Sequence, residues 1–272
     1  MPNSGRSANP KYIAPLSSRE RLILAEWERA RVSRVTRADV AGRWGAAKAD
    51  KITSALVRKG ALRRVGKGIF LVVPLRAQGR PTTPSAATLV AALLSDEPYY
   101  LGGLWALTHH RLTLQQFATR IDAFVVRDHR PRTLANAHVR FHRVPPSRIA
   151  ADGYDVVSIE GSPVRVSTRE ETLIDLLDYP DMAGATRAAL ALVEPALGDV
   201  DLGRLVRRAS AVAGSATCQR LGVLLERMGV SPSNLAALRR RAMATKSLTS
   251  MVPGTARTGP VNTRWRVVEN DR

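Results

Sequence analysis

Residues 36–73 constrain the fold of this chain more than any other segment. Apolar residues recur there first at helical spacing and then in two short runs separated by Gly66-Lys67-Gly68. This pattern predicts two helices followed by a β-hairpin. Glycine suits the hairpin turn because it reaches positive φ without a steric penalty. The order helix, turn, helix and hairpin predicts a winged helix-turn-helix.

Three helices are expected before residue 60. Ser17 or Ser18 can cap the first, which runs to about residue 30. Thr36, with Asp39 three positions later, matches the capping box of the second helix, and Gly45 ends it. The residues of these two helices that are expected to face the core share helical spacing: Leu22, Ile23, Trp27, Ala30, Val40 and Trp44.

The third expected helix, at about 47–59, divides into an apolar and a basic side. Ile52, Leu56 and Val57 form the expected inner stripe, and Gly60 is the expected C-cap. In such modules, basic side chains of this helix and of the hairpin meet the bases and phosphates of DNA. An amphipathic helix with a solvated basic face is the alternative. The expected DNA contacts are Arg37, Lys48, Lys51, Ser54, Arg58, Arg63, Arg64 and Lys67.

The distribution of charge supports the same prediction. The chain has 272 residues and a formal net charge of +19. Residues 1–80 hold 18 Lys or Arg against 5 Asp or Glu, whereas residues 81–272 hold 24 against 18. Positive charge favours a polyanionic partner, because a protein that neutralises phosphates releases their counterions. A generally basic protein from an arginine-rich proteome is the alternative that composition leaves open.

Composition and motifs also exclude several classes. Cys218 is the only cysteine in the sequence, which excludes an intrachain disulfide and fits a reducing cytoplasm. No run approaches roughly 18 apolar residues, so a membrane partner is not expected, and no apolar signal-peptide core is seen at the N-terminus. The GxxxxGK, GxSxG and HExxH motifs are missing. We therefore expect no cofactor, no metal site and no catalytic residue.

Four carboxylates cluster near one expected helix. Glu171, Asp175 and Asp178 share a face, so a divalent metal site is conceivable. A structural role is favoured instead, because Glu170 and Glu171 suit the positive end of the helix dipole. Asp175 is expected to pair with Arg169.

The whole chain is expected to be α+β, with a mixed α/β region after the N-terminal module. Proline and glycine between residues 74 and 84 indicate a domain boundary. The expected parts are a flexible arm (1–16), the winged helix-turn-helix (17–78), a linker (79–84) and the C-terminal domain (85–272). Ser167 with Glu170 matches a capping box. Helices are expected at 85–94, 104–109, after 167, and at about 184–192, 202–213, 217–228 and 233–244. Strands are expected at 121–126, 138–144, 156–159, 164–166 and 262–268.

Five segments in a fixed order carry a family resemblance. They are LVRKGALRRVGKGIFLV (56–72), YYLGGLWALTHHRLT (99–113), SREETLIDLL with Thr168 inserted after Ser167 (167–177), RLGVLLERMG (220–229), and Arg264-Trp265-Arg266-Val267 with Asn270. Together they resemble the AbiEi antitoxins of type IV toxin–antitoxin systems, which were first known from phage abortive infection. The similarity spans about residues 20–270.

The resemblance implies a winged-helix domain that binds inverted repeats in its own promoter. It also implies a C-terminal domain that counteracts a nucleotidyltransferase-like toxin, directly or indirectly. The expected function is therefore a cytoplasmic antitoxin and transcriptional autorepressor without enzymatic activity, acting as a monomer or weak dimer. The family's recognition helix often begins with more polar residues, whereas Ala46-Ala47 stands here. This difference favours phosphate contacts over base readout.

The alternative is a nuclease, or another nucleic-acid enzyme, that uses the winged helix for targeting. A nuclease of this kind needs an Asp followed by Glu-x-Lys on adjoining strands. Lys246 is the only lysine after residue 85, which argues against it. A single-strand RNA platform is also disfavoured, because aromatic residues make up 5% of the chain and are not interleaved with the basic ones.

Overall fold

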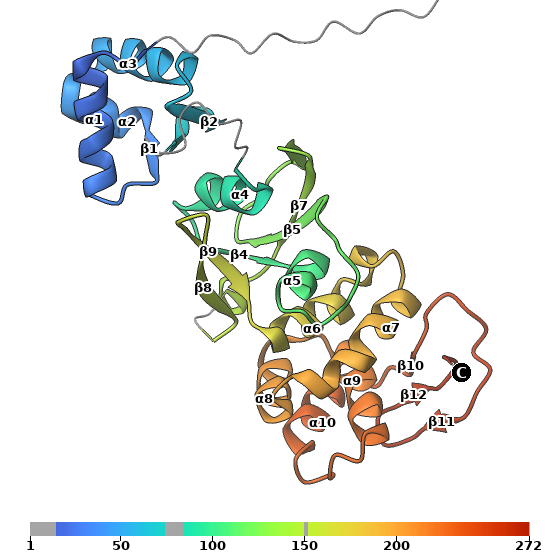
Figure 1. The fold of residues 1–272 in the computed structure, drawn as a ribbon. Helices are drawn as coiled ribbons and strands as arrows, with labels where there is room; N and C mark the ends of the chain where they lie inside the picture. The colour runs from blue at the N-terminus through green and yellow to red at the C-terminus, as the bar shows by residue number, and fades with distance from the viewer. Residues whose placement is uncertain (1–14, 74–83, 150–151, 272) are drawn as a thin grey trace, which may run out of the picture. The chain divides into compact units, whose positions relative to one another are not determined.

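The computed structural model describes residues 15–73, 84–149 and 152–271. The expected arm and linker therefore lie almost entirely outside the described residues. The chain forms two compact units: Met1–Leu93 with Glu160–Ser162, and Leu94–Ile159 with Pro163–Arg272. The fold is α+β, as expected (Figure 1). Within the described ranges, no helix combines the length and the apolarity that crossing a membrane requires.

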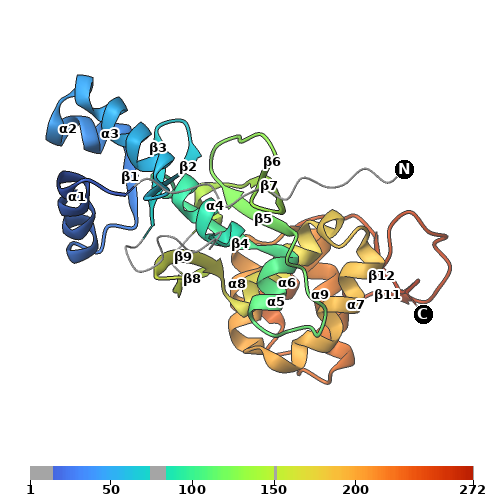
Figure 2. The ribbon, with the colours of Figure 1, turned by 45° about the horizontal axis from the view of Figure 1, so that its top comes forward.

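The described part of the first unit contains helices α1 to α4 and a small antiparallel sheet (Figure 2). The predicted capping box at Thr36 with Asp39 is present, and Ser17, one of the two predicted caps of the first helix, forms a capping box with Glu20. The strand order is β1-β3-β2. The elements are α1 (Ser18–Arg29), β1 (Arg34–Thr36), α2 (Arg37–Trp44), α3 (Ala46–Arg58), β2 (Leu62–Gly66) and β3 (Ile69–Val72), followed by α4 (Ala86–Leu94).

Strand β1 was not predicted from the sequence. It is three residues long, which is too short for an alternating pattern to be recognised. Its pairing with β3, Val35 opposite Phe70, completes the sheet and buries both side chains. The strand therefore exists because β3 offers it a partner.

The predicted core of the first unit needs correction on two helices. Leu22 is 71% exposed and Ala30 is also exposed, whereas Leu24 is buried beside Ile23 and Trp27. The buried face of α1 thus lies one position later than predicted at its start. On α3, Val57 is 36% exposed. Leu56 is buried as predicted and Ile52 is partly buried, while Ala49 and Thr53 complete the buried side of α3.

The second unit is built on a mixed six-stranded sheet of order β6-β7-β5-β4-β9-β8. Strands β5 and β7 are parallel, as are β4 and β9, while β4 and β5 are antiparallel. The strands are β4 (Tyr99–Gly102), β5 (Arg120–Val125), β6 (Arg132–Leu134), β7 (Ala137–Arg143), β8 (Tyr154–Ile159) and β9 (Ser162–Ser167).

Helices and a second small sheet complete this unit. The sheet has the order β10-β12-β11, formed by Thr249–Ser250, Val267–Val268 and Val261–Asn262. The helices are α5 (Gly103–His109), α6 (Arg169–Asp178), α7 (Thr186–Ala196), α8 (Leu202–Val212), α9 (Ser215–Arg227) and α10 (Ala236–Ala242). Three 3-10 turns lie at Pro146–Arg148, Pro180–Met182 and Leu197–Asp199.

The structure corrects three predictions about the elements of this unit. Residues 99–102, which precede the helix expected at 104–109 and for which no strand was expected, form the buried strand β4. The terminal strand expected at 262–268 is two short strands joined by a turn, in which Arg266 has a φ of 54°. Helix α6 is capped by Thr168, whose side chain accepts from the Glu171 N–H, while Ser167 bonds to the Thr172 hydroxyl. The inserted residue thus moves the cap by one position.

Two glycines show how the segments behind the family resemblance meet in the core. A Cβ on Gly102 would lie 2.6 Å from the Asp175 carboxylate, which joins segment 99–113 to segment 167–177. A Cβ on Gly222 would lie 2.2 Å from the ring of Trp265, which joins segment 220–229 to the C-terminal segment. These glycines are needed for close packing, because any side chain would displace a buried group.

Candidate nucleic-acid interface

Helix α3 separates its buried and exposed residues cleanly. Lys48, Lys51, Ser54 and Arg58 are all exposed and follow one another at intervals of three or four residues. Residues at these intervals lie along one side of a helix. The opposite side packs into the core of the first unit. The structure therefore brings the four α3 candidates onto one exposed stripe.

The start of α3 differs from the starts of α1 and α2. Its N-cap is Gly45, with a φ of 86°, and no side chain caps the first turn. That turn contains no acidic residue and includes Lys48. No carboxylate therefore compensates the positive end of the α3 dipole. At the starts of α1 and α2, Glu20 and Asp39 do so. This arrangement favours an anion near the start of α3.

The turn between β2 and β3 presents Lys67 to solvent. Gly68 occupies the left-handed region with a φ of 70°, and its carbonyl accepts from the Arg37 N–H at 2.7 Å. A bulge interrupts the register between Arg64 and Gly66. The hairpin turn is therefore attached to the first residue of α2.

Arg37 also contacts α3 through its side chain. Its guanidinium donates to both carboxylate oxygens of Asp50, at 2.6 and 2.7 Å. This hydrogen-bonded pair raises the pKa of Arg37 and lowers the pKa of Asp50. Arg37 therefore links the hairpin turn to the exposed side of α3. Because it is already paired, it is less available to a phosphate than an unpaired arginine.

Arg63 and Arg64 occupy opposite sides of β2. Adjacent residues of a strand point to opposite faces, and the structure shows Arg63 half-buried and Arg64 exposed. The guanidinium of Arg64 lies over the ring of Phe70, 5.7 Å from its centroid. Of the two residues, Arg64 is the one positioned to reach a ligand in solvent.

Other basic residues of the first unit hold its helices together. Lys59 pairs with Glu20 at 2.6 Å, which joins α3 to α1, and Arg43 pairs with Glu26. By contrast, Lys48, Lys51, Arg58 and Lys67 form no ion pair within the described ranges. We call the exposed set the basic surface; it consists of Lys48, Lys51, Ser54, Arg58, Arg64 and Lys67.

The second unit contains a buried network of carboxylates and arginines. The sequence predicts the carboxylate cluster but not its arginine partners. Arg148 donates to Glu171 at 3.1 Å and to Asp175 at 2.9 Å, and also pairs with Asp178. Arg208 donates to Glu171 at 2.6 Å. Two arginines thus supply the positive charge that the carboxylates require.

The predicted pair between Asp175 and Arg169 is wrong. Arg169 donates to the Asp199 carbonyl, and Asp175 binds Arg148 and the Tyr100 hydroxyl. Burial and the neighbouring Glu171 raise the pKa of Asp175. Among the described residues, no group of three His, Cys, Asp or Glu side chains is arranged to hold a metal ion.

A second buried acid, Asp122, has partners on the neighbouring strand β7. It accepts from Arg140 at 3.0 Å and lies 2.8 Å from Nε2 of His142. The spacing of His142 along the chain gives no sign of this contact, because the register of β5 and β7 creates it.

Comparison with known proteins shows the fold alone. No protein-family model and no curated protein matches the chain. The crystal structure of the RV2827C protein from Mycobacterium tuberculosis resembles it with a TM-score of 0.60 at 15% sequence identity. The alignment covers 94% of this chain and 92% of that chain. The two chains therefore share a fold over nearly their whole lengths.

Proposed function

We propose that the chain binds double-stranded DNA through a winged helix-turn-helix formed by α2, α3 and the β2–β3 hairpin, and represses its own promoter. The exposed stripe of α3 carries this proposal, because its three cations, Lys48, Lys51 and Arg58, form no ion pair among the described residues. The hairpin adds Lys67 beside the same helix pair through the Arg37 contact. Exposed, unpaired cations are what phosphate binding requires.

Four residues of the basic surface have an expected role. In this module the start of α3 enters the major groove, so Lys48 and Lys51 reach base edges or phosphates. Arg58, near the end of the helix, contacts the backbone, and Lys67 contacts an adjacent phosphate row. Such contacts position the protein, and sequence preference comes from those that reach base edges. An inverted repeat engages two copies of the chain, as a weak dimer or as cooperating monomers.

The antitoxin part of the proposal rests on the five AbiEi-like segments. Two pairs of them meet in the core of the second unit, at Gly102 with Asp175 and at Gly222 with Trp265. This arrangement supports their role in forming a common fold. We propose that the second unit counteracts a nucleotidyltransferase-like toxin in the cytoplasm, directly or indirectly, without chemistry of its own.

The test is a binding titration of the full chain on the DNA upstream of its own gene. We expect a complex that resists unrelated competitor DNA and weakens as salt rises. Lys51→Ala and Arg58→Ala should each weaken binding about 5- to 10-fold and reduce the slope of log K against log salt by about 1. Arg207→Ala, an exposed arginine of α8, is the matched control and should change neither quantity.

Two results would contradict the proposal. A flat salt dependence would exclude phosphate binding, and full removal by competitor would exclude a specific operator. The toxin part is tested separately with a Lys48→Glu, Lys51→Glu, Arg58→Glu triple variant. It should lose the operator yet still rescue cells that express the toxin from an unrelated promoter. If rescue is lost while the variant remains folded, the proposed division between the two units is wrong.

A further inference from the structure

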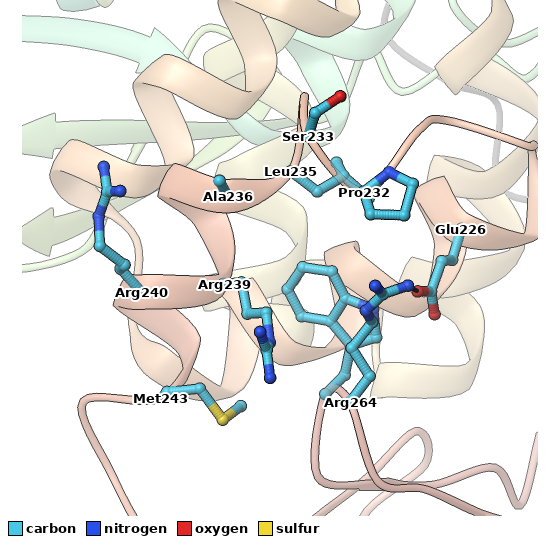
Figure 3. A pocket seen from close by; sticks show the side chains of 10 residues that line it. Glu226, Pro232, Ser233, Leu235, Ala236, Arg239, Arg240, Met243 and Arg264 are labelled. Carbon is cyan, nitrogen blue, oxygen red and sulfur yellow. Dashed lines mark hydrogen bonds and ion pairs between the residues drawn. The ribbon is translucent and has the colours of Figure 1, made fainter.

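A pocket in the second unit is not used by the proposed function. It has a volume of about 590 Å³ and lies between the end of α9, helix α10 and the turn that joins β11 to β12 (Figure 3). Its apolar lining comes from Pro232, Leu235, Met243 and Trp265. The pocket is open to solvent and its lining is more apolar than polar, so it can accept an apolar side chain of a partner.

The charge of this pocket is unbalanced. Its one carboxylate, Glu226, already binds Arg264 at 2.6 Å. Arg239 and Arg240, on the last turn of α10, are exposed, and their guanidinium groups have no hydrogen-bond or ion-pair partner within the described part of the chain. Figure 3 shows Arg239 extending from α10 toward the middle of the pocket, with Arg240 at its margin. The pocket therefore offers unpaired positive charge beside an apolar wall.

The apolar wall is held in place by the core. Trp265 is fully buried, and its ring packs against α9 at Gly222. Its backbone N–H donates to Asn262 at 3.1 Å. Its indole Nε1–H has no acceptor among the described residues. This donor is itself buried, so it is not available to a ligand in the pocket.

We propose that this pocket binds an acidic segment of a partner protein. Carboxylates of the segment pair with Arg239 and Arg240, and one large apolar side chain inserts beside Leu235 and Met243. Charge complementarity selects this occupant. Residues 1–14 and 74–83 of the chain itself contain Arg or Lys and no Asp or Glu, so they do not fit. The inference goes beyond DNA binding and does not depend on it.

The experiment selects ligands from a phage library of random dodecamer peptides on the immobilised full chain. The selected peptide is then synthesised with a fluorophore and its affinity measured by anisotropy. We expect peptides that combine several Asp or Glu residues with one large apolar residue. Arg239→Glu with Arg240→Glu should weaken binding at least about 10-fold, which corresponds to about 1.4 kcal/mol. Arg207→Glu, at an exposed position of α8, should change it less than about 2-fold.

A second variant tests the cavity rather than its charge. Ala236 lines the pocket and is exposed, so Ala236→Phe fills it without disturbing the core. It should also abolish peptide binding, while DNA affinity stays unchanged. Selection of basic peptides, failure to enrich any peptide, or binding that tolerates both variants would overturn the proposal. Loss of binding to a labelled DNA duplex in the Arg239/Arg240 variant would instead assign the pocket to nucleic acid and overturn it as well.

Discussion

Basic side chains are exposed and unpaired on α3 of the first unit but buried and paired in the core of the second. In the first unit, Lys48, Lys51 and Arg58 are exposed and form no ion pair among the described residues. In the second, Arg148 and Arg208 are only 5% and 4% exposed and are surrounded by carboxylates. A buried charge must be paired because desolvation penalises it, whereas an exposed one is solvated by water. Positive charge therefore indicates a binding surface only where the structure leaves it exposed and unpaired.

The strongest test of this difference is Arg208→Ala. Arg208 donates to Glu171, to Asp152 and to the carbonyl of Arg148. Its removal leaves Glu171 buried with one partner fewer. We expect a loss of about 3–5 kcal/mol in the free energy of unfolding, measured by urea denaturation.

The neighbouring Arg207→Ala provides the control, because Arg207 lies on the same helix and is exposed. It should change the free energy of unfolding by less than about 0.5 kcal/mol. Equal effects of the two substitutions would mean that the buried network contributes no more than a surface charge.

Glycines provide a second comparison between the units. Gly222→Ala places a Cβ against the ring of Trp265, so we expect a loss of about 2–3 kcal/mol. Gly42 lies in α2, is exposed, and would meet nothing within 4 Å. Gly42→Ala should therefore stabilise the chain by about 0.5–1 kcal/mol. Urea denaturation of both variants measures the change in the free energy of unfolding. A Gly222→Ala variant with unchanged stability would contradict the close packing.

A smaller effect is expected at the ion pair on α3. Asp50→Asn removes a negative charge from the basic side of the helix and releases Arg37. DNA affinity should rise about 2- to 5-fold, measured by anisotropy at constant salt. Asp128→Asn is the control, because Asp128 forms a similarly exposed pair with Arg143 in the second unit. A fall in affinity for Asp50→Asn would mean that the pair holds α3 and the hairpin in their DNA-binding arrangement.

The smallest effect at neutral pH is expected from the Cys218 thiol. Burial raises its pKa from 9.0 to about 12. The folded chain thus holds this proton more tightly than the unfolded chain. The thiol has no effect on stability below about pH 9, and the free energy of unfolding should fall as pH rises from about 9 to 12. At pH 8, an aromatic disulfide reagent should label Cys218 only on unfolding; rapid labelling of the native chain would contradict its burial.

Local elements of the first unit were predictable because their signals are local. Both capping boxes, the turn at Gly45 and the hairpin around Lys67 depend on residues a few positions apart. The misassigned residues also have a physical explanation. Leu22 is apolar, but α1 buries the face that contains Leu24, and a single exposed leucine costs little.

The candidate interface and the pocket differ in the same respect. The α3 stripe could be identified from helical spacing, since its four residues lie on one element. The pocket could not, because Arg239 and Trp265 come from segments that only the fold brings together. Likewise, Arg148 lies outside the segments that carry the family resemblance, so its role at Asp175 had no sequence signal.

The sequence alone determined the α+β class, the positions of most helices, the excess of positive charge and its placement on α3. Short-range periodicity and capping suffice for these properties. The tertiary structure decided the short strand β1, the partners of the buried carboxylates, the bond from Arg37 to Asp50 and the cavity beside Trp265. Each of these depends on contacts between residues distant in sequence, and such contacts form only when burial of the core brings their elements together.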